Sequence, residues 1–327
     1  SGGITDMKKY DVTALGELLV DFTENGISEQ GNALFEANPG GAPCNVLSML
    51  QKLGKRTAFI GKVGQDAFGL RLKQAAAEQG IDVEGVFLDQ NVPTTLALVS
   101  KLPDGDRDFS FYRSPGADMM LRTEELDREK VKSSRIFHFG SLSMTGEPVR
   151  SATREAVRAA EDAGVIRSFD PNLRLPLWPF EEAAREQISW GMAHCDVLKI
   201  SDNEIRWFTG CENFDEGVRT LKTAYPGIRM ICLSMGADGS RVYCEGKQVQ
   251  AGAFKTRAIE TTGAGDTFCA CVLNTVLDHG LEGWTEEELK NMLIFANAAA
   301  SIVTTRKGAL RVMPEEEEVR KLLREQN

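Results

Sequence analysis

Short apolar runs alternate with longer segments of helical periodicity along most of this chain, and this alternation restricts the folds it can adopt. The pattern is typical of a parallel β-sheet whose faces are covered by helices. With 327 residues, 42% of them hydrophobic, the chain can bury a core of that size. We therefore predict an α/β fold with a central, mostly parallel sheet flanked by helices. The expected strands are residues 11–15, 57–60, 135–139, 166–169, 197–200 and 230–234.

Two stretches, residues 19–35 and 95–113, interrupt this alternation. In the second stretch, two strand-like segments flank Pro103-Asp-Gly-Asp106, which predicts a hairpin with a Pro-Asp-Gly turn. Such strands fit poorly in the main sheet, so we place both stretches in a small β lid. The sequence has no internal repeat, low-complexity region or flexible linker. We therefore predict that residues 1–327 form a single domain into which the lid segments are inserted.

The segment Glu260-Thr-Thr-Gly-Ala-Gly-Asp-Thr-Phe268 places a glycine-rich turn directly before the apolar run of residues 267–277. Gly263 and Gly265 permit a sharp turn that exposes backbone N–H groups, and the following helix adds the positive end of its dipole. This combination predicts a phosphate site. Asp266 then has two possible roles: a helix N-cap, or a general base that removes a proton from an alcohol beside the phosphate.

A second pair of glycines stands far upstream, in Asn38-Pro-Gly-Gly-Ala-Pro-Cys-Asn-Val46, before a helical pattern over residues 46–53. Paired glycines before a helix can be no more than a loop. Alternatively, Gly40 and Gly41 let a hydroxylated ligand lie against bare backbone. In that case Asn45 offers a hydrogen-bond donor and an acceptor to the hydroxyl groups of the ligand.

Composition excludes several classes of function. The formal net charge is -10 and no basic stripe is present, so nucleic acid is not an expected partner. No apolar run approaches the ~20 residues of a membrane helix, and the beginning of the chain lacks a hydrophobic signal core. The seven cysteines lack metal-ligand spacing and are expected to be reduced, mostly buried thiols, which favours a cytoplasmic protein without membrane contact.

The common nucleotide-binding motifs are absent from the sequence. No Gly-x-Gly-x-x-Gly follows the first expected strand, which argues against a dinucleotide oxidoreductase. No Walker A loop is present either, so phosphate binding has to use the turn from Gly263 to Gly265. The three histidines, at positions 138, 194 and 279, are expected to have structural roles.

The two glycine segments together resemble the two signatures of the ribokinase-like (PfkB) sugar kinases, and the resemblance extends through nearly the whole chain. Within this family the chain is most similar to the fructokinases. The resemblance implies a ribokinase-like fold with the lid over a sugar site, and ATP and Mg²⁺ as cofactors. The closer match is carried by Ala14-Leu-Gly-Glu-Leu-Leu-Val-Asp-Phe22, Gly40-Gly-Ala-Pro-Cys-Asn45, Phe59-Ile-Gly-Lys-Val-Gly64, Phe111-Tyr-Arg-Ser-Pro-Gly-Ala-Asp118 and Asp170-Pro-Asn-Leu-Arg-Leu-Pro-Leu-Trp178.

The resemblance also assigns the sugar end of the site. It implies that Asp21 accepts hydrogen bonds from two adjacent sugar hydroxyl groups, while Gly41 and Asn45 complete the contact with a neutral sugar. It places Arg113 over the sugar from the lid and directs Arg174 at the sugar or the phosphate. Either arginine could instead be an ordinary surface ion-pair residue.

At the nucleotide end, Glu204 matches the acid of the family's Asn-x-x-Glu motif, which organises magnesium and phosphate through water. Ser201 stands where that motif has asparagine, and a charged helix start explains the segment equally well without function. The match of Ser234-Met-Gly-Ala-Asp-Gly239 implies that Gly236 and Gly239 let ATP lie close. The other residues assigned to the nucleotide are Lys199, Ser234 and Asn297, of which Asn297 borders the adenine pocket or packs a helix.

The ion site departs from the family pattern. Glu260 replaces the aspartate that opens the family's second signature and helps to hold a potassium ion in many relatives. One extra methylene moves the carboxylate by about a bond length, which is enough to disturb a fitted cation site. Activation by potassium is therefore not expected.

The resemblance implies an ATP-dependent fructokinase that phosphorylates the 6-hydroxyl group of fructose, as a homodimer joined through the lid. Asp266 takes the proton, the N–H groups of Gly263, Ala264 and Gly265 stabilise the charge, and Mg²⁺ neutralises the phosphates. One alternative is a kinase for 2-keto-3-deoxygluconate, whose carboxylate needs a cation. Another is a non-catalytic sugar-binding protein, against which the intact Asp266 and glycine turn argue.

Overall fold

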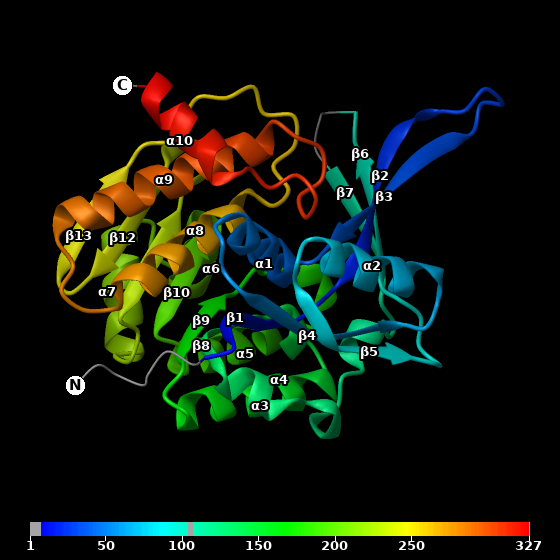
Figure 1. Cartoon of the computed structure of the whole chain (residues 1–327), viewed down its shortest axis with the longest axis horizontal. Helices are drawn as coiled ribbons and strands as arrows, with labels where there is room; N and C mark the ends of the chain where they lie inside the picture. The colour runs from blue at the N-terminus through cyan, green and yellow to red at the C-terminus, as the bar shows by residue number, and fades with distance from the viewer. Residues whose placement is uncertain (1–7, 104–106, 327) are drawn as a thin grey trace.

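A nine-stranded sheet forms the body of the molecule in the computed structural model, which describes residues 8–103 and 107–326 (Figure 1). Its strand order is β13-β12-β11-β10-β9-β8-β1-β4-β5, with parallel pairing from β5 to β11 and antiparallel pairing in β12 and β13. The expected strands are therefore confirmed. The bounds are β1 Tyr10–Leu15, β4 Thr57–Gly64, β5 Asp82–Asp89, β8 Ser134–Gly140, β9 Ile166–Asp170, β10 Val197–Ser201, β11 Met230–Ser234, β12 Ser240–Cys244 and β13 Lys247–Ala251.

Helices cover both faces of this sheet because side chains alternate along each buried strand. Phe59 and Val63 of β4 belong to one apolar core, whereas Ile60 belongs to the core on the other face. The first core includes α1 Ala42–Lys52, α2 Ala67–Glu78, α8 Ala264–His279, α9 Glu286–Thr304 and α10 Glu316–Glu325. The second includes α3 Arg128–Lys132, α4 Val149–Asp162, α5 Glu181–Ala193, α6 Asp202–Thr209 and α7 Phe214–Ala224. Short 3₁₀ segments are η2 Ala117–Met119, η3 Thr123–Glu125, η4 Leu142–Met144, η5 Leu175–Leu177 and η6 Gly236–Asp238.

The predicted lid is confirmed as a separate four-stranded sheet, which projects from the upper right of the body in Figure 1. Its order is β3-β2-β6-β7, and β2 pairs in parallel with β6. The first lid segment continues to Gly40 rather than ending at residue 35, because β3 stays paired with β2 along its whole length. The Pro-Asp-Gly turn falls at residues 104–106, outside the described part of the chain. The bounds are β2 Leu19–Ile27, β3 Ala33–Gly40, β6 Leu96–Lys101 and β7 Arg107–Tyr112.

Both helices that follow the glycine segments begin earlier than the sequence predicts. Helix α1 starts at Ala42 rather than at residue 46, since a proline is well suited to a first helical turn. Asn45 therefore lies in the first turn of the helix. Helix α8 starts at Ala264, with Gly263 as its N-cap in the left-handed conformation at φ 83°. The interpretation of Asp266 as an N-cap is thus wrong, because Asp266 lies within the first turn.

In the part of the chain that the structure describes, no helix is long and apolar enough to cross a membrane. The seven cysteines are all free, and all except Cys211 are buried, as predicted. The described residues also contain no cluster of three or more histidine, cysteine, aspartate or glutamate side chains that could hold a metal ion.

Candidate active site

A cavity of about 1010 Å³ lies between the lid and the carboxyl ends of the central strands. This is the edge at which open α/β sheets bind ligands. Side chains that directly follow β1, β9 and β10 form one wall, and lid residues such as Asp21 and Thr23 form the opposite wall. Of the residues predicted to bind ligands, the wall includes Asp21, Gly41, Asn45, Arg174, Lys199, Glu204, Ser234, Gly263, Gly265 and Asp266.

The two glycine segments meet at the bond between Asn45 and Asp266. The side-chain amide of Asn45 donates a hydrogen bond of 3.0 Å from Nδ2 to Oδ2 of Asp266. Burial, together with the negative charge of Asp170, raises the pKa of Asp266 to about 6. Asn45 is only 4% exposed, and its Oδ1 has no hydrogen-bond partner among the described residues. An unpaired buried acceptor in a cavity wall indicates a ligand that brings a donor such as a hydroxyl group.

The turn before α8 favours glycine at positions 263 and 265 and has a cation close to it. A side chain at Gly263 would place its Cβ 2.5 Å from the Cβ of Ala309, and at Gly265 it would lie 2.9 Å from Nζ of Lys199. Lys199 is buried and pairs with Oδ2 of Asp170 at 3.3 Å. Burial opposes its charged form, but Asp170, together with Glu204, Cys269 and Asp266, outweighs this effect, so the pKa of Lys199 is raised and the ammonium group stays charged. The N–H of Ala264 donates to the carbonyl of Thr261 at 3.3 Å, so Gly263 and Gly265 are the residues whose N–H groups can meet an anion beside this fixed positive charge, as a phosphate site requires.

The segment after β9 is fixed in an unusual backbone conformation. Asn172 has φ 43°, in the left-handed region that few non-glycine residues adopt. Its N–H donates to Oδ1 of Asp170 at 3.1 Å, and the N–H of Leu173 donates to Oε2 of Glu204 at 2.8 Å. These two bonds hold Asn172 and Arg174 in the cavity wall. Strained residues of this kind cluster at functional sites.

Glu204 and Ser201 form the capping box of α6. Oε1 of Glu204 accepts the N–H of Ser201 at 2.9 Å, and Oγ of Ser201 accepts the N–H of Glu204 at 3.3 Å. The serine at position 201 is thus explained by its role as the N-cap residue of α6. Each carboxylate oxygen of Glu204 accepts one backbone N–H, which leaves a lone pair on each for a water molecule.

Asp21 lies on β2 and faces the cavity from the lid. The pKa of Asp21 is raised to about 7: burial is the main cause, the positive charge of Arg174 lowers the pKa, and the charge of Glu260 raises it. A side chain at Gly40 would collide with the carboxylate of Asp21. Gly40 is therefore required to make room for Asp21, although it is not itself part of the cavity wall.

Arg113 was expected to lie over the sugar, but it is not part of the cavity wall. Its buried guanidinium group donates to Oδ2 of Asp118 at 3.0 Å, to Oγ1 of Thr145 at 2.9 Å and to the carbonyl of Leu142 at 2.9 Å. Asp118 also accepts the hydroxyl group of Thr95, which directly precedes β6. Arg113 therefore fastens the base of the lid to the body, and each of its three guanidinium nitrogens already donates a hydrogen bond within the protein.

Four other predicted residues lie outside the wall. Nδ2 of Asn297 donates to the carbonyls of Ala251 and Gly252 at 3.3 and 3.1 Å, and its Oδ1 accepts the hydroxyl group of Ser240 at 2.9 Å. Asn297 thus joins α9 to the hairpin of β12 and β13. Gly236 and Gly239 both have positive φ, at 56° and 89°, so the turn itself requires glycine. The fourth residue is Ala264, the first residue of α8.

The wall also contains residues that the sequence analysis did not single out. Glu17 lies in the connection from β1 to β2, where a carboxyl group within an apolar run was the signal that could have identified it. The φ of Asn172 is not visible in a sequence. Other wall residues without a predicted role are Thr23, Asn38, Arg107, Phe109, Phe111 and Trp207.

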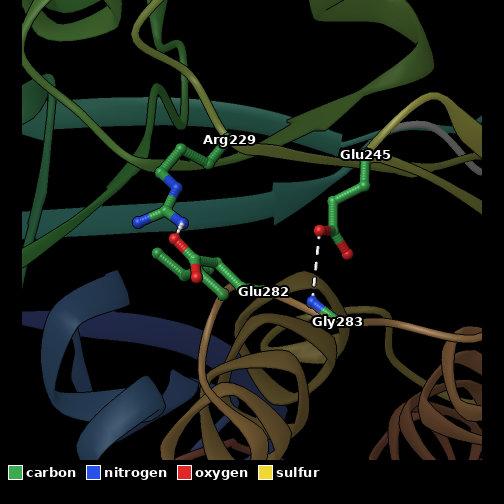
Figure 2. A pocket seen from close by; sticks show the side chains of 5 residues that line it. Arg229, Glu245, Glu282 and Gly283 are labelled. Carbon is green, nitrogen blue, oxygen red and sulfur yellow. Dashed lines mark hydrogen bonds and ion pairs between the residues drawn. The ribbon is translucent and has the colours of Figure 1, made fainter.

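A second hollow, of about 520 Å³, is lined by Arg229, Glu245, Leu281, Glu282 and Gly283 (Figure 2). Its polar groups already bind one another. Arg229 pairs with Glu282 at 2.9 Å, and Glu245 accepts the N–H of Gly283 at 3.1 Å. The larger cavity, with the unpaired Oδ1 of Asn45 and the raised pKa of Asp266, is therefore the candidate active site.

Comparison with known proteins agrees with this geometry. The family model described as pfkB family carbohydrate kinase matches residues 9–316. The probable fructokinase-2 of Arabidopsis thaliana is 40% identical over 305 residues, which cover 93% of this chain and 92% of that protein. The fructokinase of Xylella fastidiosa with bound ATP has a TM-score of 0.87 and 29% identity, and covers 97% of this chain and 98% of its own.

The fructokinase of Vibrio cholerae O395 is similar in two crystal structures. With fructose, ADP and calcium ion bound it has a TM-score of 0.85 and 27% identity, covering 96% of this chain and 99% of its own. A double mutant with fructose, ADP and potassium ion bound has a TM-score of 0.84 and 25% identity, covering 96% and 98%.

Proposed function

The chain belongs to the pfkB family of carbohydrate kinases, and from this premise we propose that it is an ATP-dependent fructokinase that phosphorylates the 6-hydroxyl group of fructose. The observation that carries the proposal is the bond between Asn45 and Asp266. It brings the hydroxyl-binding segment and the phosphate turn to one point, where an acceptor hydroxyl and a γ-phosphate can react.

In the proposed mechanism, Asp21 accepts hydrogen bonds from two sugar hydroxyl groups and Oδ1 of Asn45 accepts another. Nδ2 of Asn45 holds the carboxylate of Asp266 in place, and this carboxylate takes the proton of the 6-hydroxyl group as its oxygen attacks the γ-phosphorus. The bond from phosphorus to the β-phosphate oxygen breaks and ADP leaves. The N–H groups of the Gly263 to Gly265 turn and the ammonium group of Lys199 stabilise the charge of the transferred group.

A divalent cation fits the donors at the nucleotide end. Mg²⁺ favours oxygen ligands and retains several waters, with phosphate oxygens as direct ligands. The free lone pairs of Glu204 can accept hydrogen bonds from such waters. The ion would neutralise part of the phosphate charge, and Glu204 would hold it indirectly.

The charges at the sugar end favour a neutral acceptor over 2-keto-3-deoxygluconate. Glu17, Asp21, Glu260 and Asp266 all line the cavity, and Arg174 is the cation that offsets Asp21. Arg113, the other arginine predicted to lie near the sugar, is bound to Asp118. Among the described residues of the wall, five carboxyl groups stand against three cations, and one of these, Lys199, pairs with Asp170, so an anionic acceptor would meet an excess of acids. The raised pKa of Asp266 also supports a catalytic protein over one that only binds sugars.

We further propose that the enzyme does not need potassium. Oε2 of Glu260 accepts the N–H of Gly308 at 3.1 Å, and the N–H of Glu260 donates to the carbonyl of Thr304 at 3.1 Å. Glu260 therefore connects its loop to the segment after α9 through direct hydrogen bonds. This contact supports a turn that is ordered without a bound monovalent cation.

A coupled ADP-release assay over fructose, ribose, tagatose, adenosine and 2-keto-3-deoxygluconate tests the substrate and the ion together. We expect fructose to give the highest kcat/KM, with a KM that changes by less than about twofold between low and high ionic strength, since a neutral sugar has no charge to screen. Exchange of potassium for sodium should leave kcat unchanged.

A different outcome would identify the alternative substrate. If 2-keto-3-deoxygluconate exceeds fructose by about tenfold or more and Arg174→Ala removes that preference, the fructokinase assignment fails. Such a result would leave the family and the role of Asp266 intact.

We also propose a cytoplasmic homodimer that is joined through the lid. The lid face that carries Asp21 also carries Leu34 and Phe109, which are 46% and 48% exposed. A second copy would cover these side chains. We expect light scattering to give twice the mass of one chain, and Leu34→Glu to yield monomers. Ile259→Glu, which changes an exposed apolar residue outside the lid, should remain dimeric; a monomeric wild type contradicts the proposal.

A further inference from the structure

Helix α1 receives its N-terminal cap from another part of the chain. Its N-cap residue, Gly41, has φ 118°, and a Cβ there would lie 2.5 Å from the carbonyl oxygen of Glu17. Position 41 therefore has to be glycine, which has no side chain to accept an orphan N–H of the helix. Oε2 of Glu17 accepts the N–H of Ala42 at 3.0 Å instead. Glu17 is 3% exposed, so this bond is shielded from water.

The capped turn is the one that holds the proposed base. Asn45 lies in the first turn of α1, and its Nδ2 donates to Asp266 at 3.0 Å. Glu17 also lies in the short connection that leads into β2, the strand that carries Asp21. One carboxyl group thus links the start of the lid strand to the helix that orients Asp266.

We propose that Glu17 is a positioning residue for phosphoryl transfer: by capping α1 it fixes Asn45, and through Asn45 it fixes the carboxylate of Asp266. The identity of the sugar in this inference rests on the proposed function, whereas the contacts do not. What matters is the reach of the side chain to the N–H of Ala42 rather than its charge.

The surroundings of Glu17 support this distinction. The pKa of Glu17 is raised to about 7: burial is the main cause, its own N–H and that of Ala42 lower the pKa, and the charges of Asp118 and Asp266 raise it. A raised pKa makes the protonated form more accessible than in an exposed glutamate. In the protonated form its carbonyl oxygen still accepts the N–H of Ala42, as the oxygen of a glutamine would.

Two variants separate reach from charge. Glu17→Gln keeps the length and the acceptor but removes the charge, and we expect its kcat to stay within about threefold of wild type, since a neutral acceptor still caps the turn. Glu17→Asp keeps the charge but is one methylene shorter. It should lower kcat by about tenfold to a hundredfold, because small misplacements of catalytic groups cost this much. The KM for ATP should change by less than about twofold in both variants.

Thr285→Ala is the matched control, since Thr285 caps α9 by accepting the N–H of Glu288 at 3.1 Å and lies outside the cavity wall. It should lower the melting temperature with kcat unchanged. The kinetics are measured with the acceptor that gives the wild type its highest kcat/KM. A failure of fructose therefore overturns the substrate assignment alone.

Three outcomes would overturn the role of Glu17. Wild-type kcat in Glu17→Asp would show that the cap does not position the base. Equal defects in both variants would show that charge, rather than reach, is required. A loss of thermal stability in Glu17→Asp like that of Thr285→Ala, with unchanged kinetics, would leave Glu17 as an ordinary helix cap.

Discussion

Replacing Asp266 with asparagine is expected to lower kcat by about 10²- to 10⁴-fold while the KM values for sugar and ATP stay nearly unchanged. Asparagine has the same shape, and its oxygen can still accept the hydrogen bond from Nδ2 of Asn45. It cannot take the proton of the acceptor hydroxyl group. The coupled ADP-release assay measures the effect, and near-normal turnover would remove the central mechanistic proposal.

The pH dependence of the wild type provides a second measure of the same residue. Because the pKa of Asp266 is about 6, kcat at saturating sugar should fall as the pH drops through this value and the base becomes protonated. In the asparagine variant this dependence should be lost. If kcat falls at the same pH in both proteins, the titrating group is a residue other than Asp266.

Thermal stability is the control for this variant. A carboxyl group whose pKa is raised by folding stabilises the fold when protonated, and this contribution is lost as the pH rises from 3.8 to about 6. Above pH 7 the charged Asp266 therefore destabilises the folded protein. The asparagine variant should melt at an equal or higher temperature, so its loss of activity cannot be attributed to unfolding.

Replacing Asp21 with alanine should raise the KM for the sugar by about 30- to 1000-fold, since two charge-assisted hydrogen bonds contribute roughly 2 to 4 kcal/mol in total. The KM for ATP should change little, because Asp21 projects from the lid. Asp21 also has a raised pKa, of about 7, so its removal should not lower the melting temperature near pH 8.

Glu24→Ala removes a carboxyl group from the same strand, at an exposed position outside the cavity wall, and should leave both KM values near wild type. If Asp21→Ala raised the KM values for sugar and ATP equally, the effect would reflect a damaged fold or a different pocket rather than lost sugar contacts.

The central sheet could be predicted because its inner strands are buried on both faces and therefore form continuous apolar runs. The edge strand β5 was not predicted. It pairs only with β4 in the sheet, is half-buried over much of its length, and has Gly85 in its middle. A strand with one neighbour and one solvated side carries a weaker pattern. The start of α1 was missed because paired glycines and a proline mask the helical period at its first turn.

The local chemistry of the site was predictable, whereas the use of each side chain by distant partners was not. The glycine turn and Asp266 are adjacent in sequence, so their combination carried its own signal. Arg113 looked available for a ligand, but Leu142 and Thr145 take up two of its donors. Asn297 is engaged by the β12 and β13 hairpin in the same way. A sequence shows which donors exist, and only the fold shows which remain free.

The bond between Asn45 and Asp266 spans 221 positions, and this has a consequence for how the enzyme is made. A chain that has emerged from the ribosome as far as β13 already contains every strand of both sheets described here, together with Asp21 and Asn45. It lacks α8, and with it the proposed base Asp266 and the proposed phosphate turn. Helix α1 shares its apolar core with α8, so the apolar face of α1 cannot be fully buried until α8 has been synthesised. The residues proposed to contact the sugar are therefore synthesised before the proposed base, and phosphoryl transfer has to await the last part of the chain.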